Sequence, residues 1–192
     1  MEKKILFIVD GQFDFIEGGK LPVKGGIEAL NRLAEYIRTH AKDYVNIILT
    51  ADWHPLVHCS FKENGGQWPI HCVEFSHGAA IYQPIIDALN ETHADYIVLT
   101  KGCDEDHEEY SIFKNEISKT YLETLVENND IDTIDYCGLA FDICVANTVK
   151  DGLRYFPNAK LRVFKDFCAS IDKNSEKDFI DFLNNNERTE IV

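Results

Sequence analysis

The chain has 192 residues, a length that suits one domain with a sizeable hydrophobic core, and we expect a single domain over residues 1–192. It carries 33 acidic against 19 basic residues, a formal net charge of −14. This charge argues against nucleic acids and anionic membrane surfaces as partners and favours a small neutral ligand.

Short apolar runs alternate with longer amphipathic runs through the first half of the chain. Residues 4–9 (KILFIV) predict a buried strand, and residues 26–41 place apolar side chains at helical spacing. Residues 44–50 predict a second strand. Residues 81–90 predict a short helix, and residues 95–100 predict a third strand.

The second half of the chain continues this alternation. Residues 120–129 predict a helix, and residues 133–140 predict a fourth strand. Residues 144–156 predict another helix. Residues 160–166 predict a fifth strand, and residues 175–186 predict the last helix.

This order of elements predicts the fold class. Continuous apolar strands alternating with helices imply an α/β fold, a three-layer, doubly wound sandwich with helices on both faces of a mostly parallel sheet. We expect Asn174 or Ser175 to cap the last helix. The irregular segment at 51–80 interrupts the pattern, and a loop of this length is usually functional.

Six cysteines are spread along the chain without a CxxC pair. Because disulfide frameworks belong mostly to short secreted chains, we interpret them as reduced thiols of a cytoplasmic protein. The apolar run before Asp10 is too short for a signal peptide, and no apolar run approaches the ~20 residues of a membrane span.

Reactive side chains follow the predicted strands, at the edge where parallel sheets bind ligands. Asp10 and Lys101 end the first and third strands, and Cys144 begins a helix after the fourth. Backbone N–H groups at a helix start stabilise a thiolate and can bind an oxyanion. Separately, each residue also fits a structural role; together they suggest a nucleophile, its base and a cation that tunes the base.

The segment after the second strand is rich in metal-binding residue types. Asp52 and His54 are two positions apart and point to the same side of an extended chain, with His58 and His71 further on. Four of the seven histidines fall within 54–77. A carboxylate with imidazoles suits Zn²⁺, Fe²⁺ or Mn²⁺, although histidines that only stabilise the loop would give the same pattern.

Aromatic residues flank these polar groups. Phe13, Phe15 and Trp68 lie in loops, where they could form a flat apolar wall for an aromatic ligand or simply anchor the loops.

From Ile8 to about Asp172 the chain resembles the nicotinamidase/pyrazinamidase branch of the isochorismatase-like cysteine hydrolases. The motifs that carry the resemblance are IVDGQFDF, TADWHPLVHCSF, WPIHC, TKG, YSIF and GLAFDICVANTVKDGL. DWHPxxHxSF joined to WPxHC is specific to this branch, whereas VDxQxDF indicates only the superfamily. The resemblance implies the isochorismatase-like sandwich with about six strands.

The resemblance implies a catalytic triad of Asp10, Lys101 and Cys144. It also implies a cis peptide joining Leu139 to Ala140, with the amides of Ala140 and Cys144 forming the oxyanion hole.

The resemblance implies one divalent metal ion, zinc first, with iron or manganese as alternatives. Its ligands would be Asp52, His54 and His71, with Gln12 beside them. His58 matches a position that ligates the metal in some members and lies outside the shell in others.

The substrate would contact Phe15, Trp68, Tyr110 and Leu139. The implied activity is hydrolysis of nicotinamide to nicotinate and ammonia, a step of NAD salvage, through a thioester on Cys144. The alternatives are a related hydrolase of another carboxamide or of a ureido or N-carbamoyl compound, an isochorismatase-type ether hydrolase, a non-catalytic binding protein and a structural zinc module. Members of the family include monomers and several oligomers, so a homo-oligomer stays open.

Two segments depart from the family pattern. Residues 103–109 (CDEDHEE) are unusually acidic where Asp-Ser or similar typically precedes the YS of YSIF. The short C-terminus, RTEIV, leaves little chain for a last strand.

Overall fold

The computed structural model describes residues 2–128 and 130–192, within which six strands form one parallel sheet in the order β3-β2-β1-β4-β5-β6. The strands are β1 (Lys4–Val9), β2 (Asn46–Asp52), β3 (Tyr96–Lys101), β4 (Thr133–Leu139), β5 (Lys160–Ala169) and β6 (Thr189–Ile191). The α-helices are α1 (Gly26–His40), α2 (Gln83–Thr92), α3 (Glu116–Asn128), α4 (Ala146–Tyr155) and α5 (Lys173–Asn184).

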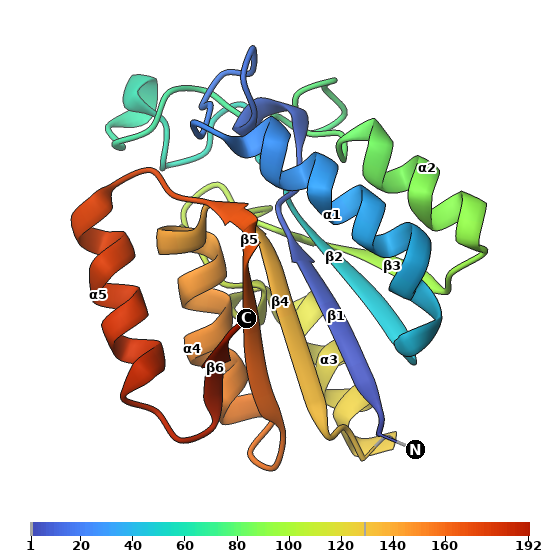
Figure 1. Ribbon diagram of the computed structural model, residues 1–192. Helices are drawn as coiled ribbons and strands as arrows, with labels where there is room; N and C mark the ends of the chain where they lie inside the picture. Colours follow the sequence, from blue (N-terminus) through green and yellow to red (C-terminus); the bar gives the residue numbers. More distant parts are fainter. Residues whose placement is uncertain (1, 129) are drawn as a thin grey trace.

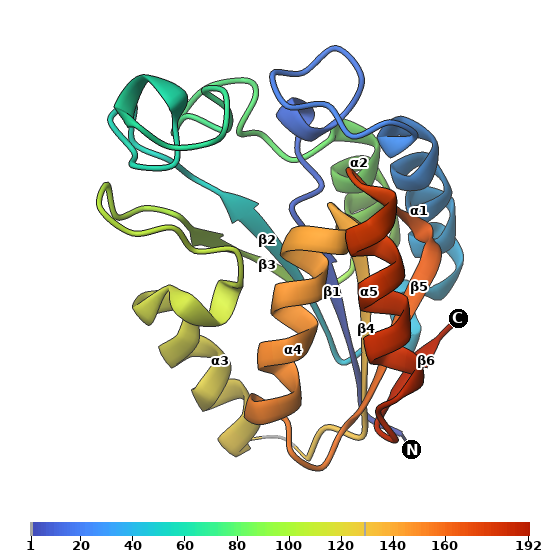
Figure 2. The same ribbon diagram turned by 90° about the vertical axis from the view of Figure 1, so that its left-hand side faces the viewer.

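The helices cover both faces of the sheet, which confirms the predicted three-layer α/β fold. Figures 1 and 2 show α1 and α2 on one face and α3, α4 and α5 on the other. The central strand β1 is buried from Ile5 to Val9, and Phe7 stacks on Tyr136 of β4 with ring centroids 5.1 Å apart. Burial of each such side chain stabilises the fold by about 1.5–3 kcal/mol. The centre of the sheet therefore holds the ends of its strands in fixed positions.

Most differences from the predicted elements lie at their ends. The predicted helix at 120–129 begins earlier, at Glu116. Its first turn was missed because Ile117 is exposed there and the turn has no apolar face; residue 129 lies outside the described residues. The predicted caps Asn174 and Ser175 were wrong. Asp172 caps α5 instead, and its side chain accepts hydrogen bonds from both of their backbone N–H groups.

The predicted helix at 144–156 and the C-terminus also differ. The turn Phe141–Val145 is a π-helix, and the α-helix proper runs from Ala146, two residues after the predicted start, to Tyr155. The C-terminal residues do form a strand, β6, because they pair in parallel with β5. Within the described residues, no helix has both the length and the apolar character needed to cross a bilayer.

The sheet order places a crevice between β1 and β4. From β1 the chain proceeds outward to β2 and β3, and later returns to β4 on the other side of β1. Parallel sheets bind ligands at such a switch point, beyond the carboxyl ends of the strands. Asp10 directly follows β1, and Cys144 lies in the turn that follows β4.

Gly138 allows β4 to approach β1 closely just below this crevice. It has φ +114°, and a Cβ atom built on it would lie 2.0 Å from the carbonyl oxygen of Val9. A side chain at this position would therefore both strain the backbone and push the two central strands apart.

We expect Gly138→Ala to lower the free energy of unfolding by about 3 kcal/mol or more, because backbone strain and overpacking add. The matched control is Gly18→Ala, since Gly18 has φ +97° but nothing within 4 Å of its would-be Cβ. It should cost only about 1–2 kcal/mol. Urea denaturation measures both losses, and equal losses would contradict the close approach of the strands.

Candidate active site and metal site

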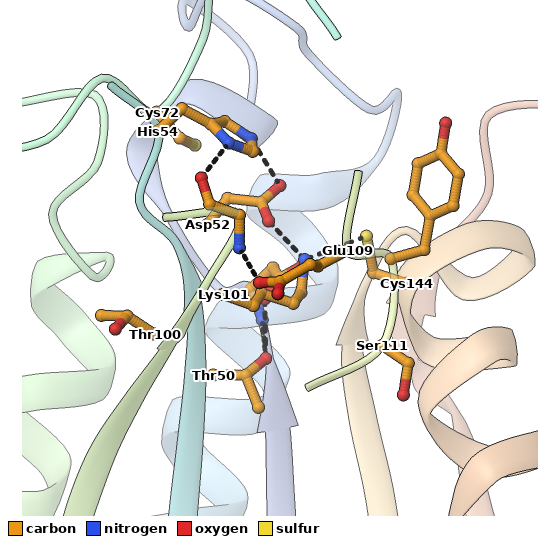
Figure 3. Close-up of polar contacts among 12 residues, drawn as sticks. Thr50, Asp52, His54, Cys72, Thr100, Lys101, Glu109, Ser111 and Cys144 are labelled. Carbon is orange, nitrogen blue, oxygen red and sulfur yellow. Dashed lines mark hydrogen bonds and ion pairs between the residues drawn. The ribbon is translucent and has the colours of Figure 1, made fainter. Parts of the chain in front are cut away.

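Asp10, Lys101 and Cys144 come together at the carboxyl ends of β1, β3 and β4. The Lys101 Nζ lies 2.8 Å from Asp10 Oδ2 and 3.7 Å from Cys144 Sγ, and it also contacts Asp52 Oδ1. Figure 3 shows the Lys101 amine between the carboxylate of Asp52 and the sulfur of Cys144. All four side chains are buried, so these charges interact with little screening by water.

Thr50 fixes the position of Asp10. Its hydroxyl donates to Asp10 Oδ1 at 2.6 Å, and its carbonyl accepts from the backbone N–H of Asp10 at 3.1 Å. Sequence reasoning missed this residue. The available signal was a hydroxyl residue inside an otherwise apolar buried strand.

The surroundings set the protonation of the three groups. Burial raises the pKa of the Cys144 thiol well above its usual value, and Lys101 opposes this only in part. Burial also raises the pKa of Asp10, which makes it a stronger base. Burial alone would lower the pKa of Lys101, but the carboxylates of Asp10 and Asp52 raise it well above its usual value. The resting site therefore holds a thiol, a carboxylate base and an ammonium ion.

Asp52, His54 and His71 form a second group that shares Asp52 with the first. The Oδ2 of Asp52 lies 3.6 Å from His54 Nε2 and 3.8 Å from His71 Nε2. Each residue offers one ligand atom, and these atoms all lie within 4.8 Å of one another. Burial would raise the pKa of Asp52, but Lys101 and both histidines lower it far below its usual value, so the carboxylate is anionic.

The two histidines are oriented as metal ligands are. His54 Nδ1 lies 2.9 Å from the carbonyl oxygen of Gly102, and His71 Nδ1 lies 2.8 Å from that of Pro69. Donation from Nδ1 to a carbonyl leaves the Nε2 lone pair facing Asp52. One carboxylate and two imidazoles with open positions between them fit a divalent metal ion.

Gln12 and Gly102 keep Asp52 and His54 in position. Gln12 donates to the carbonyl oxygen of Asp52 and accepts from its N–H, both at 2.8 Å. Gly102 has φ +67°, and a Cβ there would lie 2.5 Å from His54 Nδ1, so a larger residue would displace the ring.

His58 has different partners. Its Nδ1 lies 3.3 Å from the backbone nitrogen of Ser60, which donates to it, and its Nε2 lies 3.1 Å from the carbonyl oxygen of His107. Its ring packs on His54 with centroids 4.1 Å apart. In this arrangement both ring nitrogens of His58 are engaged by the protein, and its role as a metal ligand stays a prediction.

Several predicted substrate contacts surround the thiol. Phe15, Trp68, Tyr110 and Ala140 line the same small cavity as Cys144. The indole Nε1 of Trp68 donates to the Tyr110 hydroxyl at 3.0 Å, which ties the two loops together across the cavity.

Other predictions fit this cavity less well. Leu139 is completely buried in the core, and it is the next residue, Ala140, that borders the cavity. The peptide bond between these two residues is cis, as expected. Phe13 packs against His77 with ring centroids 4.2 Å apart and the rings tilted by 37°, and it lines a neighbouring groove of about 740 Å³ and not this cavity.

Sequence reasoning also missed parts of the cavity wall. These residues are Leu21, Glu108, Ile143 and Ile171. The acidity of segment 103–109 was visible in the sequence, but nothing there indicated which of its acids faces the thiol.

Comparison with known proteins places this geometry in a family. The profile of the isochorismatase domain family matches residues 4–190. The chain is 31% identical to a nicotinamidase of Escherichia coli, covering 90% of this chain and 85% of the relative. It is 32% identical to a nicotinamidase/pyrazinamidase of Mycobacterium tuberculosis, covering 90% of this chain and 89% of the relative.

A solved structure agrees with this. The pyrazinamidase of Pyrococcus horikoshii in complex with zinc superimposes with a TM-score of 0.84 at 29% identity, covering 99% of this chain and 98% of that one. The chain therefore belongs to the isochorismatase domain family, and within it to the nicotinamidase/pyrazinamidase branch.

Proposed function

We propose that the chain hydrolyses nicotinamide to nicotinate and ammonia through a thioester on Cys144, as a step of NAD salvage. The observation that supports this best is the sharing of Asp52 between two groups. It pairs with Lys101, which contacts Asp10 and Cys144, and it faces the two histidines. A nucleophile and a ring-orienting site are thus built around one small cavity, and the related nicotinamidases from bacteria act on this substrate.

In the first half of the reaction Asp10 accepts the proton of the Cys144 thiol. The sulfur attacks the carboxamide carbon, and the carbonyl π electrons move to the oxygen. The backbone amides of Ala140 and Cys144 stabilise that oxyanion, and each such donor is worth about 3 kcal/mol. The tetrahedral intermediate then expels ammonia, which takes its proton from Asp10, and a thioester remains on Cys144.

In the second half Asp10 deprotonates a water molecule, which attacks the thioester carbon. The C–S bond breaks, the proton on Asp10 returns to the sulfur, and the free carboxylic acid loses the second water proton to solvent and leaves as nicotinate. Lys101 remains an ammonium ion throughout. It keeps Asp10 in place and balances the charge that the site gains when the thiol loses its proton.

The ring would lie between Phe15 and Trp68, with Tyr110 at its edge. Asp52, His54 and His71 would hold one divalent ion, which we propose to be zinc, with iron or manganese able to replace it. When bound, this ion supplies a ligand position for the ring nitrogen and so orients the carboxamide toward Cys144. Orientation of this kind can supply several kcal/mol of the barrier.

The proposed activity is tested by ammonia release from nicotinamide, pyrazinamide and an N-carbamoyl amino acid. Nicotinamide should be turned over, and Cys144→Ala should lose at least about 10³-fold of kcat. Cys168→Ala, a change at another buried cysteine, serves as the control and should keep activity. Ammonia release by the Cys144 variant at the native rate would rule out the thioester.

Thr50→Val should lower kcat about tenfold to a hundredfold with little change in KM, because Asp10 loses the hydroxyl that fixes its orientation. Thr148→Val is the matched control. Thr148 is fully buried, and its Oγ1 has no hydrogen-bond partner among the described residues. If the two variants had equal kcat, Thr50 would have no part in placing the base.

Metal content tests the second group independently of activity. After loading with zinc and desalting, the native chain should retain about one ion by elemental analysis. Asp52→Asn, His54→Ala and His71→Ala should each retain far less, whereas His77→Ala, a change in a neighbouring loop, should match the native chain. Full zinc retention by the His71 variant would contradict the assignment of the ligands.

A further inference from the structure

Glu108, in the acidic segment 103–109, lies at the wall of the cavity that contains Cys144. It shares this wall with Trp68 and Tyr110, and on its other side it borders an open groove of about 520 Å³. One of its carboxylate oxygens, Oε1, accepts a hydrogen bond from the backbone N–H of Glu109 at 3.1 Å. Of the acids in this segment, Glu108 is the one that borders the cavity.

Contacts on both sides hold this residue in place. The preceding carbonyl, of His107, accepts from His58 Nε2 at 3.1 Å. The following side chain, Glu109, is buried and accepts from the backbone N–H of Gly102 at 2.6 Å and from Asn115 at 3.2 Å. Figure 3 shows Glu109 directed inward beside the buried group. The residue between these two anchors therefore has a defined position at the cavity wall.

Burial and the charge of Asp52 raise the pKa of Glu108, and the charges of His54 and Lys101 oppose this rise only in part. The charged or titratable side chains around the cavity include Asp52 and His71, but Asp52 pairs with Lys101. Glu108 makes no ion pair with any residue in the described ranges 2–128 and 130–192. Its charge also acts on a neighbouring group in the cavity wall: burial raises the pKa of Tyr110, and Glu108 adds to the rise.

The reaction proposed above changes the charge of the molecule in this cavity. Nicotinamide is neutral, whereas nicotinate carries a carboxylate. Like charges in a partly buried site repel, so the carboxylate of Glu108 would weaken the binding of anionic nicotinate but not that of neutral nicotinamide.

We propose that Glu108 is a specificity-determining residue, whose carboxylate disfavours anionic ring compounds in the cavity and so promotes release of the acid product. The proposal rests on the proposed function, because it takes nicotinate as the product. It assigns to the acidic segment a role in selecting the charge of the ligand, separate from the catalytic steps.

The test is a set of dissociation constants measured by calorimetry on zinc-loaded protein in a Cys144→Ala background, which prevents turnover. Three ligands are compared: nicotinamide, nicotinate and the cation 3-(aminomethyl)pyridine. Glu108→Gln should bind nicotinate about three- to tenfold more tightly and the cation correspondingly more weakly, as expected for removal of one negative charge near a partly hydrated site. The Kd ratio of nicotinate to nicotinamide should fall.

Glu105→Gln is the matched control, because it removes the same charge from the same segment at an exposed residue that does not border the cavity. It should leave the Kd ratio unchanged. An unchanged ratio in Glu108→Gln, an equal change in both variants, or a shift of the same sign for the anion and the cation would each overturn the proposal.

The failure of the proposed function would look different. In that case the native enzyme would release no ammonia, and neither nicotinamide nor nicotinate would bind to the Cys144→Ala protein, so both proposals would fall. Binding of these ligands with an unaltered ratio would overturn only the role of Glu108.

Discussion

The buried ammonium of Lys101, held between the carboxylates of Asp10 and Asp52, is the interaction on which the site depends. Three charges with almost no exposure to water cost several kcal/mol each unless every one is paired. Loss of one partner would leave the others buried and uncompensated. The positions of the strand ends, the hydroxyl of Thr50 and the amide of Gln12 therefore all serve the same geometry.

The parallel sheet provides this geometry because it brings distant parts of the sequence to one edge. Lys101 ends β3, yet its long side chain reaches the sulfur that follows β4, on the far side of β1 and β2. Asp52 ends the strand between them and faces both ways, toward the ammonium and toward the histidines. In the proposed mechanism, the sharing of this carboxylate means that one element, the end of β2, positions both the thiol chemistry and the ring-orienting site.

Much of this could be predicted from the sequence, because apolar runs and the residues that end them are local signals. Asp10, Lys101 and Cys144 each follow such a run, and the α/β class follows from the alternation of elements. The features that were missed depend on contacts between residues far apart in the sequence, or on helix turns whose side chains are exposed or polar. Thr50 meets Asp10 forty positions away, α3 starts on a turn that exposes Ile117, and Asp172 caps α5 from just outside the apolar pattern.

The two anchors around Glu108 have a consequence for the evolution of this enzyme. One is the backbone carbonyl of His107, which any residue at that position would supply. The other is the buried side chain of Glu109, whereas residues 103–106 are exposed. Residues in that stretch can change identity without touching the buried charges. If Glu108 has the proposed role, a change at this one position would alter which ligand charges the cavity tolerates while the buried charges keep their partners.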